Sequence, residues 1–333
     1  MVTGADGMLG NSVVRELLKR GYAVEVFLEQ GKDNGTLTDL PVRIHYGNLL
    51  SPDSYKSILP ECEYLINCAA VTNVYPRRNE LCKKLNNEAV IVLAEHALRT
   101  GIKRFVHVGS ANSFKGGSKC YPGNENCPFD LEKYRMDYIS SKYEAQVRLL
   151  EMHKKQNLPV IIVNPTFMIG PFDSGPSSGK MIMHLIRNQL PGYSKGGRSF
   201  VYSVDVARAL VNALKHGSTG ECYITGGENL TYLEFLSKVC DVVNIEFTLS
   251  KIPSFLMKLC GFCSSVWARL SVRPPVLSYG MSLLAGKDQY YSSEKAIREI
   301  GYIQTPIEQA IYDCVLWFME NGKLERLTYE LQG

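Results

Sequence analysis

The chain has 333 residues, of which 45% are hydrophobic and 21% are charged, and its formal net charge at pH 7 is +4. These values are ordinary for a soluble globular protein, and the length allows one large domain or two interleaved ones. The small positive charge includes no run of five or six basic residues, so the composition gives little support to nucleic-acid binding.

The first residues lack the basic start and the apolar core of a secretory signal, so we expect a cytoplasmic protein. In that reducing compartment the ten cysteines of the chain would be free thiols. Cys260 and Cys263 form a CxxC pair without a second pair at zinc-site spacing, and the six histidines are scattered. The sequence therefore predicts no metal site.

Three glycines at every third position, Gly4, Gly7 and Gly10, stand near the start of the chain. The stretch SVVRELLKR follows with apolar residues at helical spacing and stops at Gly21. A glycine loop between a strand and a helix binds the pyrophosphate of a dinucleotide, because glycines allow close backbone approach and the helix N-terminus offers free N–H groups. Only two residues precede Thr3, so the first strand is either unusually short or lacks residues at the start of this chain.

Short apolar runs then alternate with amphipathic stretches. Strands are expected at AVEVFL, VRIHYGNL, CEYLINCAA, KRFVHVGS and LPVIIVNP, and helices at about 86–99 and at DYISSKYEAQVRLLEMHKKQ. Strand–helix–strand units of this length imply right-handed crossovers and a parallel sheet covered on both faces. The predicted fold class is α/β, with a doubly wound parallel sheet of Rossmann type.

Beyond Pro165 the alternation weakens. The stretch GPFDSGPSSGK is expected to be a loop, SFVYSVDVARALVNAL and ECYITGG to return to the sheet region, and the remainder to be mostly helical. We therefore expect a nucleotide-binding domain and a smaller, mostly helical substrate-binding domain. The first would comprise residues 1–163 plus about 198–226, and the second about 164–197 plus 227–333.

The longest apolar stretch is IPSFLMKLCGFCSSVWARL, near residues 252–270. Lys258 and two serines interrupt it, so no membrane span is expected. The preferred interpretation is a helix that covers a substrate pocket, and the alternative is a helix that lies on a membrane surface.

The end of the second predicted strand normally contacts the adenosine ribose of the cofactor. In YAVEVFLEQGK this region offers Glu29 and no arginine. A carboxylate there would repel the 2′-phosphate of NADP, so NAD is slightly favoured over NADP. Lys32 could still accommodate NADP, and Glu29 could be a solvated loop charge.

A Tyr-x-x-x-Lys pair places a phenol and an ammonium one helical turn apart. Roughly one such pair is expected by chance in this composition, and the sequence contains two, Tyr138 with Lys142 and Tyr291 with Lys295. The first pair starts a long helix between two predicted parallel strands, and Ser110 ends the strand before it, where α/β sheets hold their ligands. Tyr291 and Lys295 lie outside the predicted sheet, so this pair is interpreted as the one that occurs by chance.

Proton transfer near neutral pH requires the pKa of a tyrosine, ordinarily about 10, to fall by roughly 3. The positive charges of Lys142 and of an oxidised nicotinamide would stabilise the phenolate of Tyr138 and lower its pKa. The hydroxyl of Ser110 would hydrogen-bond the substrate oxygen.

The sequence resembles the extended short-chain dehydrogenase/reductase superfamily, also called the NAD-dependent epimerase/dehydratase family. The motifs that carry the resemblance cover nearly the whole chain and include VTGADGMLG, LINCAA, GSAN, YISSK, VNPTFMIGP, SVDVARA and YITGGENLTYLEFL. Within the superfamily, the chain looks most like dihydroflavonol-reductase-like proteins and the similar hopanoid-associated sugar epimerases.

This resemblance implies a catalytic triad of Ser110, Tyr138 and Lys142, with Lys142 also holding the nicotinamide ribose. It implies that Asn86 supports the active site, and that Asn48 stands where the family often has an aspartate facing adenine. The residues expected to contact the cofactor are Gly4, Asp6, Gly7, Met8, Leu9, Gly10, Glu29, Asn48, Leu49, Ala69, Ala70, Tyr138, Lys142 and Pro165, and those expected to contact the substrate are Asn112 and Arg198.

Three functions remain open at this point. The favoured one is a reductase of a carbonyl compound, and the second is a nucleotide-sugar epimerase or dehydratase in which Arg198 would bind the diphosphate. The third is a catalytically idle NAD(P)-binding sensor or scaffold, against which the intact triad argues. The resemblance further implies a homodimer through the helix that carries Tyr138 and the helix before it, although apolar stripes there could equally be core.

Overall fold

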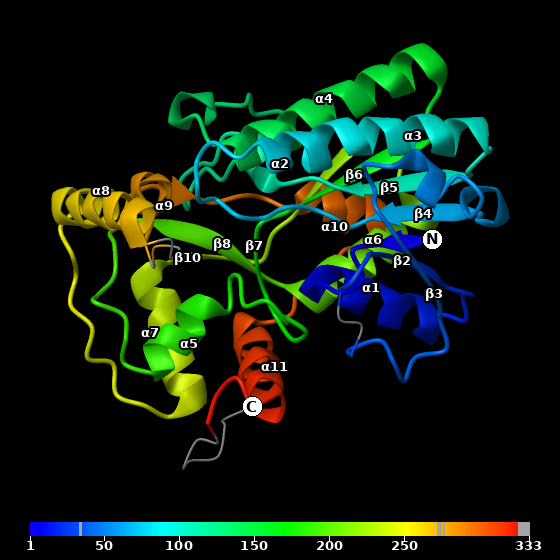
Figure 1. Ribbon diagram of the computed structural model, residues 1–333. Helices are drawn as coiled ribbons and strands as arrows, with labels where there is room; N and C mark the ends of the chain where they lie inside the picture. The colour runs from blue at the N-terminus through cyan, green and yellow to red at the C-terminus, as the bar shows by residue number, and fades with distance from the viewer. Residues whose placement is uncertain (33–34, 272–274, 276, 326–333) are drawn as a thin grey trace.

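The structure of the protein is a computed structural model that describes residues 1–32, 35–271, 275 and 277–325. Residues 326–333 of the expected second domain therefore lie outside the described residues. Figure 1 shows the path of the chain from a parallel sheet with its helices to a group of helices around a smaller sheet.

Seven parallel strands form the main sheet, in the order β3-β2-β1-β4-β5-β6-β9. Their bounds are β1 Val2–Thr3, β2 Glu25–Glu29, β3 Arg43–Gly47, β4 Tyr64–Asn67, β5 Arg104–Val108, β6 Val160–Pro165 and β9 Cys222–Thr225. The order proceeds outward on both sides of β1, and every pair is parallel. This arrangement confirms the predicted doubly wound sheet, and it brings the carboxyl ends of β1, β4, β5 and β6 to one edge.

Helices cover both faces of this sheet (Figure 1). On one face α1 (Met8–Lys19) packs against α6 (Ser203–His216), and α10 (Glu294–Ile300) packs against α6. On the other face α3 (Ala89–Arg99) packs against α4 (Asp137–Gln156). Each layer has its own buried cluster of aliphatic side chains, so the apolar stripes of these helices are core.

The predicted helix at about 86–99 begins earlier than expected. The helical segment begins with α2 (Glu80–Lys83), whose N-terminus is capped by the side chain of Asn79. A π-helical turn at Lys84–Glu88 joins α2 to α3. Such turns insert one residue into a helix and re-aim the side chains that they carry. Here the turn carries Asn86, which is fully buried.

A second, smaller sheet lies beside the first and consists of β7 Phe167–Ile169, β8 Gly197–Tyr202, β10 Glu228–Thr231 and β11 Asp288–Gln289. The stretch SFVYSVDVARALVNAL is therefore divided: its strand, β8, joins the smaller sheet, while its helix, α6, packs on the main sheet. The strand in ECYITGG returns to the main sheet as β9. The physical reason is that β9 occupies the edge beside β6, while β7 starts two residues after β6 ends and pairs with β8 instead. The division into two domains with the bounds given above stays a prediction.

The helices that remain lie around the smaller sheet. They are α5 Lys180–Ile186, α7 Tyr232–Val243, α8 Ser254–Ser271, α9 Tyr279–Ala285 and α11 Ile307–Glu320. Short 3₁₀ turns occur at Pro52–Ser54, Leu59–Glu61, Ala111–Ser113 and Glu132–Tyr134. Among the described residues, no helix combines the length and the apolar character that crossing a bilayer would require.

Candidate active site

The glycine loop joins β1 to α1, and two of its glycines are required by the local backbone. Gly4 has a φ of +66°, and a Cβ there would lie 2.7 Å from the Cα of Ala69. A Cβ on Gly10 would lie 2.1 Å from the carbonyl oxygen of Gly4. These two positions therefore let the loop, the helix and the end of β4 approach one another closely.

Gly7 differs from its two neighbours, because a Cβ there would meet nothing closer than the Gly4 carbonyl oxygen at 3.6 Å. Gly7 is the N-cap of α1, and within the described chain no side chain caps this helix and no acidic residue occupies its first turn. The free N–H groups and the open space in front of them fit the pyrophosphate of a dinucleotide.

The other residues of this loop that are expected to contact the cofactor are Asp6, Met8 and Leu9. Met8 and Leu9 are buried in the first turn of α1, with 8% and 7% of their surface exposed. The carbonyl of Asp6 accepts a hydrogen bond from Ser174 Oγ at 3.2 Å. The side chain of Leu9 belongs to the buried core, and the N–H groups of the first turn of α1 have no side-chain cap among the described residues.

The residues expected on the adenine side of the cofactor lie at or just after the ends of β2, β3 and β4. Glu29 ends β2, is exposed, and pairs with Lys32 at 3.7 Å. Asn48 follows β3, and its Oδ1 accepts from the N–H of Leu50 at 2.9 Å. Ala69 follows β4, and its N–H donates to Thr3 Oγ1 at 3.3 Å. Glu29 therefore stands at the end of β2, as the sequence predicts, and the ammonium of Lys32 lies beside its carboxylate.

The structure assembles Ser110, Tyr138 and Lys142 at the edge where β5 ends and α4 begins. Ser110 follows β5, is buried, and its Oγ accepts from the N–H of Asn112 at 3.2 Å. Tyr138 is half-buried in the first turn of α4. Lys142 lies one turn further and is buried, and its Nζ donates to the carbonyl of Val108 at 2.8 Å.

The pKa of Tyr138 is affected most by burial of the phenol. Burial raises this pKa above its ordinary value, while a hydrogen bond with Ser110 and the positive charge of Arg198 act in the opposite direction. Burial has this effect because desolvation penalises a phenolate. The predicted fall in this pKa, which depends on the charge of an oxidised nicotinamide as well as on Lys142, stays a prediction.

Lys142 itself has an altered acidity. Burial lowers the pKa of its ammonium to about 8, against smaller opposing effects of the thiols of Cys68 and Cys82. The group nevertheless keeps most of its positive charge at neutral pH. The buried ammonium is held in place by the Val108 carbonyl.

Asn86 supports this site from the π-helical turn. Its Oδ1 accepts from the N–H of Val71 at 2.8 Å, and its Nδ2 donates to the Val71 carbonyl at 2.9 Å. The same Nδ2 lies 3.4 Å from the Oγ of Ser141, the residue before Lys142. The side chain thus connects the loop after β4 to α4.

A second buried network beneath Ser110 was missed by the sequence analysis. Asn164 Nδ2, near the end of β6, donates to the carbonyl of Ser110 at 3.1 Å and to Gln146 Oε1 at 2.8 Å. Gln146 lies on α4, one turn after Lys142, and both amides are buried. The signal available in the sequence was an asparagine within the otherwise apolar strand VIIVNP. Pro165, the next residue, ends β6 and is buried.

The smaller sheet brings Arg198 toward the same edge. Its Nε donates to the hydroxyl of Tyr232 at 2.7 Å, and its guanidinium carbon lies 5.4 Å from the ring centroid of Phe167. Its charge acts on the phenol of Tyr138. The half-buried arginine therefore lies between the rings of Phe167 and Tyr232 and close enough to Tyr138 for its charge to act on the phenol.

Asn112, the other expected substrate residue, lies in the turn after Ser110. Its Oδ1 accepts from Gln289 Nε2 at 3.4 Å. Gln289 pairs in register with Arg198 on β8 and is buried, and its own Oε1 has no partner among the described residues. No sequence pattern pointed to Gln289, because β11 contains only two residues.

The rival pair Tyr291 and Lys295 has structural contacts. Tyr291 lies before α10 rather than on a helix, and its hydroxyl donates to the carbonyl of Phe114 at 3.1 Å. Lys295 Nζ donates to Glu221 Oε2 at 2.6 Å. The two residues do not form a Tyr–Lys face on one helix.

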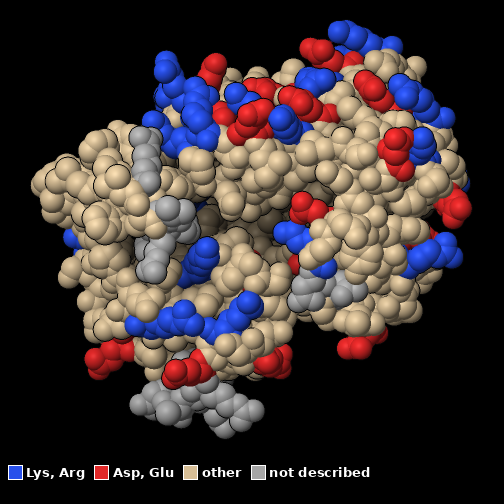
Figure 2. All heavy atoms as spheres, viewed as in Figure 1, with Lys and Arg blue, Asp and Glu red and all other residues tan. Residues whose placement is uncertain are grey.

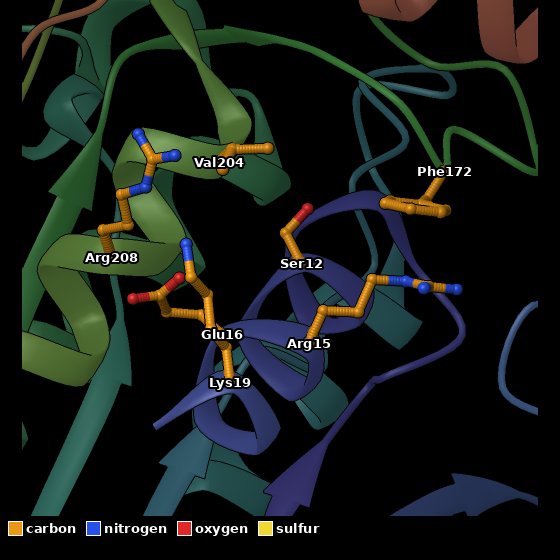
Figure 3. A pocket seen from close by; sticks show the side chains of 7 residues that line it. All are labelled: Ser12, Arg15, Glu16, Lys19, Phe172, Val204 and Arg208. Atoms are coloured by element: carbon orange, nitrogen blue, oxygen red, sulfur yellow. The ribbon is translucent and has the colours of Figure 1, made fainter. Parts of the chain in front are cut away.

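A shallow pocket of about 190 Å³ lies elsewhere, between α1 and α6. Figure 3 shows Arg15 of α1 beside Phe172, with Val204 and Arg208 on α6. The guanidinium carbon of Arg15 lies 4.5 Å from the Phe172 ring centroid. Because Ser110, Tyr138 and Lys142 do not line this pocket, it is separate from the candidate active site.

Comparison with known proteins identifies the family. The NAD dependent epimerase/dehydratase family matches residues 1–226. A Synechocystis protein provisionally named a dihydroflavonol 4-reductase is 28% identical and aligns with 96% of this chain and 94% of its own length. "Sterol demethylase protein B" of Methylococcus capsulatus is also 28% identical, over 97% of this chain and 99% of its own.

A solved structure has the same fold. The crystal structure of gox2253 superposes with a TM-score of 0.85 and 29% sequence identity, and covers 97% of this chain and 98% of its own. The match of the family extends from the glycine loop through Ser110, Tyr138 and Lys142 to the end of β9. The chain is therefore an enzyme of the NAD dependent epimerase/dehydratase family, which belongs to the extended short-chain dehydrogenases/reductases.

Proposed function

We propose that this protein is an NAD(P)-dependent oxidoreductase that interconverts a carbonyl group and an alcohol on a largely apolar substrate. The observation that carries the proposal is the placement of Ser110, Tyr138 and Lys142 together at the edge that the glycine loop also faces. Ser110 follows β5 and acts on the pKa of the Tyr138 phenol, and Lys142 lies one turn after Tyr138 on α4. A protein that only bound the cofactor would not need these three side chains together.

The residues of the chain would divide the proton chemistry among them. In the direction of reduction, Tyr138 Oη donates its proton to the substrate oxygen, and Ser110 Oγ hydrogen-bonds that oxygen. The ammonium of Lys142 favours the resulting phenolate and would hold the nicotinamide ribose. The cofactor, when bound, supplies or accepts the hydride.

The positive charge that brings the Tyr138 pKa toward neutrality would come in part from the oxidised cofactor. In its absence the phenol is held protonated by burial, which suits a proton donor. The Asn164–Gln146 pair fixes the backbone of Ser110, so it would act as a positioning element.

An apolar substrate is favoured by the surroundings of Tyr138. The tyrosine packs against a buried cluster of Leu131, Met136, Ile139 and Leu284. The name of the Methylococcus relative refers to a sterol, a compound with a large apolar ring system. Arg198 would then bind a single polar or anionic group on such a substrate.

A nucleotide-sugar epimerase or dehydratase is the second candidate, and one observation favours it. The terminal nitrogens of the Arg198 guanidinium have no partner among the described residues, so they could bind a diphosphate as a fork. This reaction would return the hydride to the sugar and consume no net cofactor.

The experiment that separates the candidates begins with titration of the purified protein with NADH and NADPH. We expect tighter binding of NADH because of Glu29. Carbonyl compounds, sterol-like ketones and UDP- or dTDP-sugars are then added while the nicotinamide absorbance is followed. Net oxidation of the reduced cofactor by a carbonyl supports the proposal, and sugar conversion without net oxidation supports the second candidate.

A further inference from the structure

Helix α8 carries apolar residues on two opposite faces, one buried and one exposed. Met257, Gly261 and Ala268 are buried and define its inner face. The opposite side carries a stripe of large apolar residues at the spacing i, i+4, i+7, i+11 and i+15. We define this outer face of α8 by its five residues, which are Phe255, Leu259, Phe262, Val266 and Leu270.

The outer face of α8 is open to solvent. The exposed fractions are 69% for Phe255, 55% for Leu259 and 74% for Leu270, and Trp267 next to the stripe is 68% exposed. Single exposed apolar residues are ordinary, whereas a contiguous apolar patch marks an interaction surface. The 18 residues of α8 extend the patch over roughly 27 Å.

The charge around the patch limits what can cover it. Residues 247–271 and 277–287 contain four Lys or Arg residues and no Asp or Glu. Figure 2 shows the lobe of α8 as a tan surface without red on this face. An apolar stripe in a segment with only positive charge is complementary to the headgroups and upper acyl chains of an anionic phospholipid bilayer.

The contacts of α8 connect it to the candidate active site. Ser265 on α8 accepts a hydrogen bond from Tyr75 Oη at 3.3 Å through its carbonyl. The ring of Phe262 lies 6.1 Å from that of Tyr279, the first residue of α9. Further along α9, Leu284 belongs to the cluster that includes Tyr138. Figure 2 shows a hollow between this lobe and the part of the molecule that carries α1.

We propose that the outer face of α8 docks the protein on the surface of an anionic phospholipid bilayer, with the helix lying in the plane of the interface. Docking would bring the edge that holds Tyr138 close to the bilayer, from which an apolar substrate could enter. This second step rests on the proposed function, whereas the docking itself does not.

A second copy of the chain is the other occupant that the geometry allows. Symmetric packing of two copies through α8 would bring two positively charged segments together, and this repulsion disfavours it. A bilayer with anionic lipids neutralises the same charges.

The test uses the purified full chain and vesicles of phosphatidylcholine, with or without phosphatidylglycerol. Binding is measured by co-flotation and by tryptophan fluorescence. Trp267 is exposed, while the other tryptophan, Trp317, is buried with 8% of its surface exposed. A blue shift on vesicle addition therefore reports Trp267 entering an apolar environment.

We expect binding to the anionic vesicles that weakens as salt is added. The double variant Leu259→Glu/Leu270→Glu should bind at least about tenfold more weakly, since it adds negative charge and removes apolar area. Ile303→Glu is the matched control because Ile303 is 68% exposed and lies outside α8. This control should bind like the wild type.

Two results would overturn the proposal. One is that the wild type binds no vesicles, including the case in which it forms a dimer that the double variant abolishes. The other is that the double variant binds as tightly as the wild type. Vesicle binding needs no turnover, so its failure is distinct from a failure of the proposed oxidoreductase activity.

Discussion

The cofactor side and the substrate side of this site are built in different ways. The cofactor side that we expect uses backbone from one continuous stretch, the loop from Gly4 to Gly10, where a strand feeds directly into a helix. The substrate side that we propose uses side chains from distant segments, such as Tyr138, Arg198 and Gln289. The first arrangement depends on one local stretch of the chain, whereas the second depends on how distant segments fold together.

The largest expected effect tests whether chemistry depends on Tyr138. Tyr138→Phe should lower turnover by two or more orders of magnitude, the usual scale for loss of a general acid, and leave cofactor affinity nearly unchanged. Tyr291→Phe is the matched control, because it removes the hydroxyl of the rival pair. Steady-state kinetics and NADH titration check both variants. Full turnover by Tyr138→Phe would refute the assignment of the proton donor.

The next prediction distinguishes the roles of Gly7 and Gly10 in the loop that would bind the cofactor. Gly7→Val should fold and bind the cofactor on the order of tenfold or more weakly, because the added side chain enters the open space that the pyrophosphate would occupy. Gly10→Val should instead cost about 3 kcal/mol or more of folding stability, since its Cβ would meet the Gly4 backbone. Thermal unfolding and cofactor titration distinguish the two outcomes. A Gly7→Val protein with unchanged cofactor affinity would contradict the loop assignment.

A smaller effect, on KM, is expected for variants of Arg198 on the proposed substrate side. Arg198→Met should raise KM about tenfold for a substrate with a polar or anionic group, and should leave cofactor affinity unchanged. Arg198→Lys keeps the charge but loses the planar fork. A KM closer to the wild-type value than that of Arg198→Met would indicate that the charge of Arg198 contributes to binding. If KM did not move with either variant, Arg198 would only support Phe167 and Tyr232.

The smallest effect concerns stability at Lys142. Its pKa in the folded protein is about 8, against about 10.4 in an unfolded chain, so at neutral pH the fold keeps a buried ammonium at a cost. Lys142→Met should therefore be more stable than the wild type by about 1–2 kcal/mol at pH 7, after the loss of the bond to Val108. Its turnover should fall.

The pH dependence of this effect has a defined sign. Between pH 8 and about 10 the folded wild type releases the Lys142 proton while the unfolded chain still binds it, so wild-type stability rises relative to the variant. The advantage of Lys142→Met should shrink over this range. Urea unfolding at pH 7 and at about pH 9.5 measures it. An advantage that grew with pH would show that the ammonium is not the destabilising group.

Particular elements show how far the sequence could be interpreted. The helix expected at DYISSKYEAQVRLLEMHKKQ is α4 with the same bounds, because its apolar periodicity and flanking turns are local signals. The sequence could not predict that the strand in SFVY joins the smaller sheet, because strand pairing depends on which edge is free and not on the strand's own residues. The helix before Asn86 was missed, since a π-helical turn has no pattern of its own.

The amino-acid sequence was sufficient to predict the parallel sheet and the glycine loop, because hydrophobic periodicity and glycine spacing are local properties of the chain. It also placed Tyr138 and Lys142 on one helix, as the structure has them. The tertiary structure alone decided the acidity of Tyr138 and Lys142, since desolvation depends on what packs around a group. It also decided that Asn164 fixes Ser110, and that the apolar stripe of α8 faces outward. A pattern shows that a helix has an apolar face, but only packing determines whether that face meets the protein or its surroundings.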